Sequence, residues 1–240
     1  MFLAGRVACI VVPPAQAIAN KIRLIKTSQT VFCLIRFDVS IKYLYHEKWL
    51  DFSYNSETAP NSEESNMIIR PASYADSAML AQIQVDSYRN AYAGILPQTY
   101  LENFDYDEQT QDWQDLLLSE RAFILLVAED ENGWILGYTL GHAGSDGFEG
   151  YDSVLDALHV QRSEQRQGVG RSLIGGMATR LAAGGANSIM CWVLLQNPAR
   201  ALYERLGGKP LGHRSITLGE DTVAEEIAYG WSDISDLARL

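Results

Sequence analysis

The sequence predicts an α/β domain of the α+β type, with a mixed central β-sheet of about six or seven strands flanked by helices. Two observations carry this prediction. Downstream of Met67, short apolar and β-branched runs alternate with segments whose apolar residues recur every three or four positions. In the middle of that region, two successive strand-like runs are each followed by a helix-like segment, which is typical of parallel strands joined through a helix.

The first predicted elements are a strand at 67–70, two helices and a β-hairpin. Ser73, with Asp76 three positions later, forms a capping box before a helix with Met79, Leu80 and Ile83 on one side. A second helix is predicted over 107–118. The strand-like runs 122–130 and 134–143 are separated by a Glu-Asn-Gly turn signal, so they form a hairpin.

The later elements form a strand–helix–strand–helix unit followed by two strands. Residues 154–160 are strand-like, and a helix over 169–183 presents an apolar stripe made of Val169, Leu173, Met177 and Leu181. Residues 188–195 form the next strand. The next helix has Asn197 as N-cap, Pro198 as its first residue and Gly207 as its stop. Strands over 211–218 and 223–231 complete the sheet.

The first 66 residues differ from the rest of the chain. Residues 52–66 are rich in Ser, Asn and Glu, as linkers are, and Met67 then reads as the start of a domain that extends to residue 236. Residues 1–66 are therefore an appended or disordered extension, or an upstream translation. Two features leave other readings open: Ile35 to Tyr43 alternates as a strand would, and the extreme N-terminus loosely resembles a secretory signal.

Composition narrows the function classes. Residues 1–66 carry 7 of the 19 basic and 6 of the 30 acidic residues, which leaves 12 basic against 24 acidic residues in 67–240. Such a surface repels nucleic-acid phosphates and weakly favours cationic ligands. No apolar run approaches the ~20 residues of a membrane span. The three cysteines and four histidines show no disulfide or metal spacing, which favours a cytoplasmic protein without a metal.

A phosphate-binding loop is predicted where residues 165–170 read QRQGVG. A Rossmann fingerprint would need glycine where the chain has Leu173, and a Walker A loop would need lysine and a hydroxyl where it has Gly176 and Met177. A strand, a glycine turn and a helix N-terminus remain. Unpaired N–H groups at that terminus favour an anion, and glycines at 168 and 170 let it approach the backbone.

Three motifs together resemble the GNAT superfamily of N-acetyltransferases. QRQGVG and the strand before it resemble the family's motif A, and NPARALYERLGG, from Asn197 to Gly208, resembles its motif B helix. AYAGILPQTYL at 91–101 resembles the substrate-side loop of many bacterial members, as does the closing AYGW. The resemblance covers about residues 67–236. It implies the GNAT fold, acetyl-CoA as co-substrate and the coenzyme A pyrophosphate as the anion.

The resemblance also implies roles for particular residues. The strand before the loop pairs its backbone with the pantetheine arm, which implicates Leu158 and Val160. The other implied cofactor-binding residues are Gln165, Arg166, Gln167, Gly168, Val169, Gly170, Arg171 and Asn197. The implied reaction is direct attack of an amine on the thioester in a ternary complex, with a strand N–H stabilising the oxyanion. Tyr203, at the tyrosine position of motif B, is the implied acid for the departing thiolate. The capping role of Asn197 and a core role of Tyr203 stay as alternatives.

The catalytic base is left open. Histone-type members carry a glutamate on the strand where this chain has Val154. Asp156 lies two residues on and is expected on the same side of the strand, while His159 is expected on the opposite face as a packing residue. His142 is a further proton acceptor to consider.

Two functions are carried forward. The first is an N-acetyltransferase acting on a small-molecule or exposed protein amine. The second is a non-catalytic module that senses acyl-CoA. The acceptor is not named by the sequence, no nucleic acid or membrane partner is expected, and a homodimer is left open.

Overall fold

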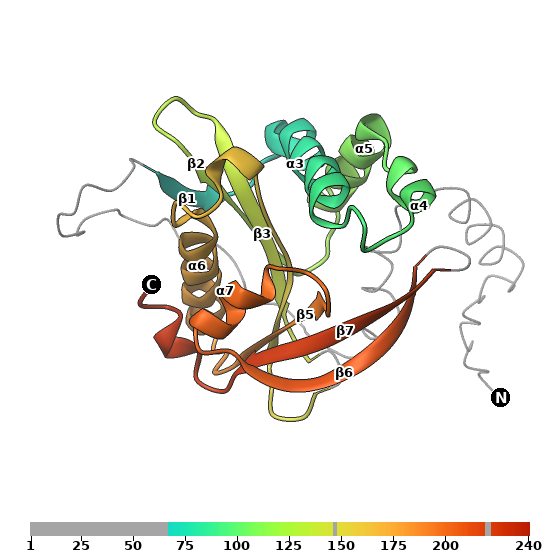
Figure 1. Cartoon of the computed structure of the whole chain (residues 1–240). Helices are drawn as coiled ribbons and strands as arrows, with labels where there is room; N and C mark the ends of the chain where they lie inside the picture. Colours follow the sequence, from blue (N-terminus) through green and yellow to red (C-terminus); the bar gives the residue numbers. More distant parts are fainter. Residues whose placement is uncertain (1–66, 146–147, 219–221) are drawn as a thin grey trace, which may run out of the picture.

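The computed structural model describes residues 67–145, 148–218 and 222–240 (Figure 1). The Ile35–Tyr43 segment and the linker at 52–66 lie outside them. The described residues form one seven-stranded mixed sheet in the order β1-β2-β3-β4-β5-β7-β6. Its strands are β1 (Ile68–Pro71), β2 (Ile124–Glu129), β3 (Ile135–Ala143), β4 (Ser153–Val160), β5 (Ile189–Leu194), β6 (Lys209–Leu218) and β7 (Thr222–Trp231). Only β4 and β5 pair in parallel. The predicted fold class is confirmed.

Helices cover both faces of the sheet (Figure 1). On one face, α6 (Val169–Ala183) and α7 (Arg200–Arg205) pack in a core with Leu126, Leu155 and Ile227. On the other, α3 (Ser77–Ala91) and α5 (Tyr106–Leu117) pack on β2 and β3. The short α4 (Gln98–Glu102) lies in a third apolar cluster with the far ends of β6 and β7. Three short 3-10 turns complete the described chain: η1 (Tyr74–Asp76), η2 (Arg162–Glu164) and η3 (Ile234–Asp236).

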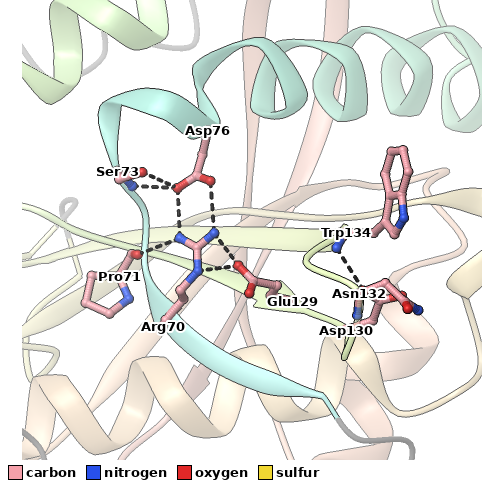
Figure 2. Close-up of polar contacts among 8 residues, drawn as sticks. All are labelled: Arg70, Pro71, Ser73, Asp76, Glu129, Asp130, Asn132 and Trp134. Carbon is pink, nitrogen blue, oxygen red and sulfur yellow. Dashed lines mark hydrogen bonds and ion pairs between the residues drawn. The ribbon is translucent and has the colours of Figure 1, made fainter.

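An ion-pair network fixes β1 to the start of α3 (Figure 2). The Asp76 carboxylate accepts hydrogen bonds from the Ser73 N–H at 2.6 Å, from the Ser73 hydroxyl at 2.9 Å and from the Arg70 guanidinium at 2.8 Å. Arg70 also pairs with Glu129 on β2. The carboxylate partners raise the pKa of Arg70, and Arg70 lowers the pKa of Asp76. The predicted capping box is present, and through Arg70 its Asp76 also connects the start of α3 to strands β1 and β2.

Two irregularities in β4 position the site. Its parallel pairing with β5 is limited to Val154 opposite Met190 and Leu155 opposite Cys191, so the later residues of β4 have no partner on that side. Its pairing with β3 shifts register, because Leu140 lies opposite Ala157 while Gly141 lies opposite Leu155. The intervening Asp156 is therefore the extra residue of a β-bulge, which bends the strand and redirects side chains.

The helices follow the predictions except around α4 and α7. The α6 bounds are those predicted, and Gly176 is a packing position, since a Cβ there would lie 2.8 Å from Ile69. The segment with α4 was predicted only as a loop. The α7 helix begins at Arg200, three residues after the predicted N-cap, because Pro198 and Ala199 form a turn first. Its predicted stop is confirmed: Gly207 has φ +82° and its N–H donates to the Glu204 carbonyl.

Candidate active site

The loop before α6 is held by its own side chains. The Gln165 amide donates to the Val160 carbonyl at 3.2 Å, and the Gln167 amide donates to the Ser163 carbonyl at 2.8 Å. Gly168 is the N-cap of α6 at φ +91°, and Arg166 takes the left-handed region at φ +67°. A non-glycine residue in that region is strained, and such strain gathers at ligand sites. The two glutamine side chains thus shape the loop.

The N-terminus of α6 forms a cradle of unpaired backbone N–H groups, an arrangement that favours an anion. The first intrahelical bond reaches Ser172, which leaves the N–H groups of Val169, Gly170 and Arg171 directed out of the helix. The Val169 side chain is buried, so only its backbone faces the loop. The Arg166 and Arg171 side chains are exposed at the rim. The cradle therefore combines free donors, the positive end of a 15-residue helix and two cations.

Gly170 keeps open the space between this cradle and β4. A Cβ on it would lie 3.4 Å from Leu202, 3.7 Å from Val160 and 3.8 Å from Leu158. Those are ordinary contact distances, so the first methyl fits and anything larger enters the space between β4 and α7. The residues fit a thin, extended group that continues from a phosphate at the loop.

The free edge of β4 extends this path. The Gln161 N–H donates to the Leu136 carbonyl of β3, and backbone directions alternate along a strand. The N–H groups of Leu158 and Val160 consequently point away from β3, into the gap that opens where β4 and β5 part. The Val160 carbonyl already accepts from Gln165. Two backbone donors thus remain for an amide-containing ligand.

Tyr203 of α7 lies at the core side of this gap. Its side chain is 6% exposed and its ring packs against Tyr229 and Trp231. Burial, with Cys191 and Tyr92 nearby, raises the pKa of its hydroxyl well above the ordinary value. The phenol is therefore protonated at neutral pH, as a proton donor must be. Among the described residues its hydroxyl has no hydrogen-bond partner.

Asn197 has the capping role that the sequence predicted as one of its two alternatives. Its Oδ1 accepts a hydrogen bond from the Ala199 N–H at 2.8 Å, and its Nδ2 lies 3.4 Å from the Tyr92 hydroxyl. The first contact caps the turn that leads into α7. The second connects that turn to the segment between α3 and α4.

Asp156 and His142 form a pair on the side of the sheet that faces α3 and α5. His142 Nδ1 lies 2.8 Å from Asp156 Oδ2, with the side chains 13% and 21% exposed. Val154, beside them, is buried in an apolar cluster. The two proton acceptors considered separately from the sequence are thus one hydrogen-bonded unit.

His159 was predicted on the opposite face from Asp156, and that prediction is wrong. Both side chains line one pocket, because the bulge at Asp156 adds a residue and breaks the strict alternation. The packing role of His159 is confirmed, since its ring stacks on Tyr88 and packs at a tilt against Tyr138. Burial lowers its pKa to about 4, so the imidazole is neutral at pH 7.

The pocket beside Asp156 also contains residues that the sequence did not single out. It lies between α3, α5 and the sheet, and its lining residues are Gln84, Asp112, Trp113, Tyr138, Leu140, Asp156, Ala157 and His159. Asp112 and Gln84 belong to no motif, and only their helical spacing was visible in the sequence. Within the residues that the structure describes, no group of three or more His, Cys, Asp or Glu could hold a metal ion.

The site thus combines a helix N-terminus with unpaired N–H groups, a pair of parallel strands that part beside it, and ionisable side chains on both faces of β4. The model of the acetyltransferase (GNAT) family matches residues 80–208. The chain is also 32% identical over 173 residues to the uncharacterized N-acetyltransferase YuaI of Bacillus subtilis, covering 72% of this chain and 96% of that protein. This chain belongs to the GNAT family of acetyltransferases, and it is an acyltransferase.

Solved structures show the same fold. The PaiA N-acetyltransferase from Thermoplasma acidophilum, in complex with coenzyme A, superposes with a TM-score of 0.56 at 16% identity, over 69% of this chain and 99% of that chain. YncA from Salmonella typhimurium, with acetyl-CoA, gives a TM-score of 0.51 at 22% identity, over 69% of this chain and 93% of that chain. No helix among the described residues is long and apolar enough to cross a membrane.

Proposed function

We propose that this enzyme transfers the acetyl group of acetyl-CoA to an amine of a small molecule or an exposed protein amine, by direct attack in a ternary complex. One observation carries the proposal. The α6 cradle and the Asp156–His142 pair lie on opposite faces of β4, next to the stretch that has parted from β5. A cofactor entering from one face and an amine from the other would meet at this stretch.

Backbone groups supply most of the cofactor contacts in this proposal. The N–H groups of Val169, Gly170 and Arg171 would bind the pyrophosphate, with the Arg166 and Arg171 side chains adding charge at the rim. The free edge at Leu158 and Val160 would pair with the pantetheine amides. Acetyl-CoA supplies the activated acetyl group as a thioester. A β4 N–H directed into the gap would bind the carbonyl oxygen as negative charge develops on it.

Proton transfer is assigned to side chains on the two faces of β4. Asp156 with His142 would first accept a proton from the ammonium, which frees the lone pair of the amine nitrogen. As that nitrogen then bonds to the acetyl carbon and the carbon–sulfur bond breaks, the protonated Tyr203 would donate its proton to the thiolate, and the second proton of the acetylated nitrogen would restore the phenol. Amines with pKa near ~10 are charged at neutral pH, so an acceptor group is required. These side chains, with family membership, favour the enzyme over a non-catalytic sensing module.

The cysteines support a compartment for the reaction, and the acidic charge bears on the kind of acceptor. Three cysteines with no pairing spacing favour a reducing environment, so we place the reaction in the cytoplasm. The acidic body disfavours nucleic acid as the acceptor.

Steady-state kinetics with a panel of polyamines, amino acids, aminoglycosides and peptides tests the proposal. For the best acceptor, velocities measured against both substrates should give intersecting double-reciprocal lines, as a ternary complex requires. Asp156→Asn should lower kcat by roughly 10²-fold, while KM for acetyl-CoA is nearly unchanged. The exposed Asp107→Asn is the matched control. Parallel lines, or full turnover of Asp156→Asn, would contradict the mechanism.

A further inference from the structure

Helix α7, which carries Tyr203 at the core side of the gap between β4 and β5, needs anchors outside itself. It is six residues long, and its N-cap residue, Ala199, makes no side-chain capping bond. A helix this short is marginal in isolation, so contacts with other elements must fix its position. At its C-terminal end, the Trp231 indole donates to the Leu206 carbonyl at 2.7 Å. The N-terminal end requires a separate anchor.

Arg200, the first residue of α7, supplies that anchor. Its Nη1 donates to the Leu195 carbonyl, just past the end of β5, at 2.7 Å, and its Nε donates to the Tyr229 hydroxyl of β7 at 3.1 Å. Its Nη2 lies 3.5 Å from the Glu204 carboxylate, one turn further along α7. A guanidinium has donors in fixed directions and can bridge such groups, which the single ammonium of lysine cannot do. Arg200 therefore joins α7 to β5 and β7.

The Leu195 contact lies where β5 has parted from β4. The last β5 residue paired with β4 is Cys191, and the Leu195 N–H donates to the Glu225 carbonyl of β7 at 2.8 Å. The chain at the end of β5 is thus bonded to β7 through its N–H and to α7 through its carbonyl. One guanidinium sets the spacing between the parted strand and the helix that carries Tyr203.

The other two contacts of Arg200 contribute less to the position of α7. The Tyr229 hydroxyl is also bonded to Glu204, and the Tyr229 ring packs against Tyr203 independently of that hydroxyl. The Arg200 side chain is 32% exposed, so solvent screens its ion pair with Glu204. The Leu195 carbonyl, in contrast, has no other donor within the described part of the chain. Loss of Arg200 would leave the N-terminal end of α7 without its bond to β5.

We propose that Arg200 is a positioning residue for acetyl transfer: by binding the Leu195 carbonyl it holds α7 against the end of β5, and so keeps the Tyr203 phenol within reach of the coenzyme A sulfur. The inference rests on the proposed function, which makes Tyr203 the acid. The Tyr203 hydroxyl has no partner of its own among the described residues, so its position depends on that of α7. A displacement of about 1 Å can cost roughly 10²-fold in rate.

The pKa of the coenzyme A thiol, bound to the full chain, tests this inference without turnover. Thiolate absorbance is followed against pH, with the desulfo-coenzyme A complex as the blank. A phenol that donates to the sulfur stabilises the thiolate and lowers that pKa below its ordinary ~8.5. Tyr203→Phe should raise it by about one unit, and Arg200→Met by a similar or smaller amount. Arg205→Met, which removes the same charge from an exposed position of α7, should leave it unchanged.

Turnover of the best acceptor gives the second measurement. Arg200→Met should lower kcat roughly 10–10²-fold with KM for acetyl-CoA nearly constant, while Arg205→Met keeps both. Because Arg200 acts through Tyr203, adding Arg200→Met to Tyr203→Phe should change neither kcat nor the thiol pKa further. A merely structural role, or a direct effect of the lost charge, would add its own change. Arg200→Lys keeps one donor for the Leu195 carbonyl and should lose less than Arg200→Met. Thermal melts establish that each variant is folded.

The outcomes separate this inference from the proposed function. Additive changes in the double variant, equal losses in Arg205→Met, or an Arg200→Lys protein as impaired as Arg200→Met would overturn the positioning role. An unchanged thiol pKa and kcat in Arg200→Met would overturn it too, and would leave the acetyl transfer standing. If the thiol pKa responds as expected but no amine is acetylated, the proposed function fails while the positioning role stands. If Tyr203→Phe changes neither quantity, the inference fails together with the acid role of Tyr203.

Discussion

The two faces of β4 are built in different ways. Toward α6, the groups that meet the gap are mostly backbone: N–H groups of the loop and helix, the free edge of the strand, and the space that Gly170 leaves open. Toward α3 and α5, the groups are side chains from separate elements, namely Asp112, His142 and Asp156. The first face is contiguous in sequence over 158–171, and the second assembles residues 44 positions apart.

Under the proposed function, this difference follows from what each face would recognise. A pyrophosphate and an amide chain can be held by backbone donors, whose geometry is set by a strand, a turn and a helix N-terminus. An amine acceptor must be bound and deprotonated, which requires ionisable side chains in a defined polar setting. A substitution that fills the space beside the backbone donors should therefore weaken the binding of acetyl-CoA. Substitution of a single side chain on the other face should change either turnover or the choice of acceptor.

The largest effect on turnover is expected at Tyr203, a side chain on the α6 face of β4. Tyr203→Phe keeps the ring among Tyr229 and Trp231, so stability should change little, while kcat falls by roughly 10²–10⁴-fold and KM for acetyl-CoA stays nearly constant. Tyr229→Phe is the matched control. Its hydroxyl is bonded to Glu204 and Arg200, so it should lose about 1 kcal/mol of stability and keep kcat. If Tyr203→Phe keeps full turnover, the Tyr203 hydroxyl has no part in catalysis and the residue is a core aromatic only.

The second-largest effect is expected on acetyl-CoA affinity, at the α6 face of β4, where backbone groups predominate. Gly170→Val should weaken acetyl-CoA binding at least roughly hundredfold, because its methyl groups fill the space bordered by Leu158, Val160 and Leu202. Gly170→Ala, whose single methyl is at ordinary contact distance, should cost far less. Calorimetry measures both affinities, and thermal melts establish that each variant is folded. If a folded Gly170→Val protein binds acetyl-CoA with the original affinity, this loop is not part of the cofactor site.

A smaller effect is expected at Asp112, on the side-chain face. The pKa of Asp112 is about 6 in the folded protein against an ordinary 3.8, so the folded state holds its proton over a range where the unfolded chain has lost it. Stability therefore falls as pH rises from about 4 to about 6. Asp112→Asn should stabilise the protein by about 1 kcal/mol at pH 7, after allowance for solvent screening, and by nothing below about pH 4. Denaturant titrations at both pH values measure this, and a gain that is independent of pH would contradict it.

The smallest effect is expected from removing residues 1–66. Both faces of β4 are formed by elements downstream of Met67, so we propose that the chain from Met67 onward is an autonomous N-acetyltransferase domain. The predicted end at residue 236 is too early, because Leu237 is buried in the main core. A chain that begins at Met67 should keep its melting temperature, its affinity for acetyl-CoA and its kcat. If that chain aggregates while the full chain is stable, the segment with Ile35–Tyr43 belongs to the domain.

The sequence by itself determined the local features of this protein. The bounds of α6, the stop at Gly207 and the hairpin of β2 and β3 were predictable, because periodicity, glycine and turn signals act within a few residues. The QRQGVG loop was recognisable for the same reason. Its two glutamine side chains were predicted for the cofactor, and in the structure they donate to the carbonyls of Val160, at the end of β4, and of Ser163, in η2.

Only the tertiary structure decided the acceptor side. The bulge at Asp156, which gathers Asp156 and His159 into one pocket, depends on the register between β3 and β4, and strict alternation cannot reveal it. Pairing of His142 with Asp156 joins residues 14 positions apart, and the approach of Asp112 depends on how α5 packs on the sheet. A side chain's ionisation and partners depend on burial and on neighbours from other elements, so they are defined only once those elements have packed.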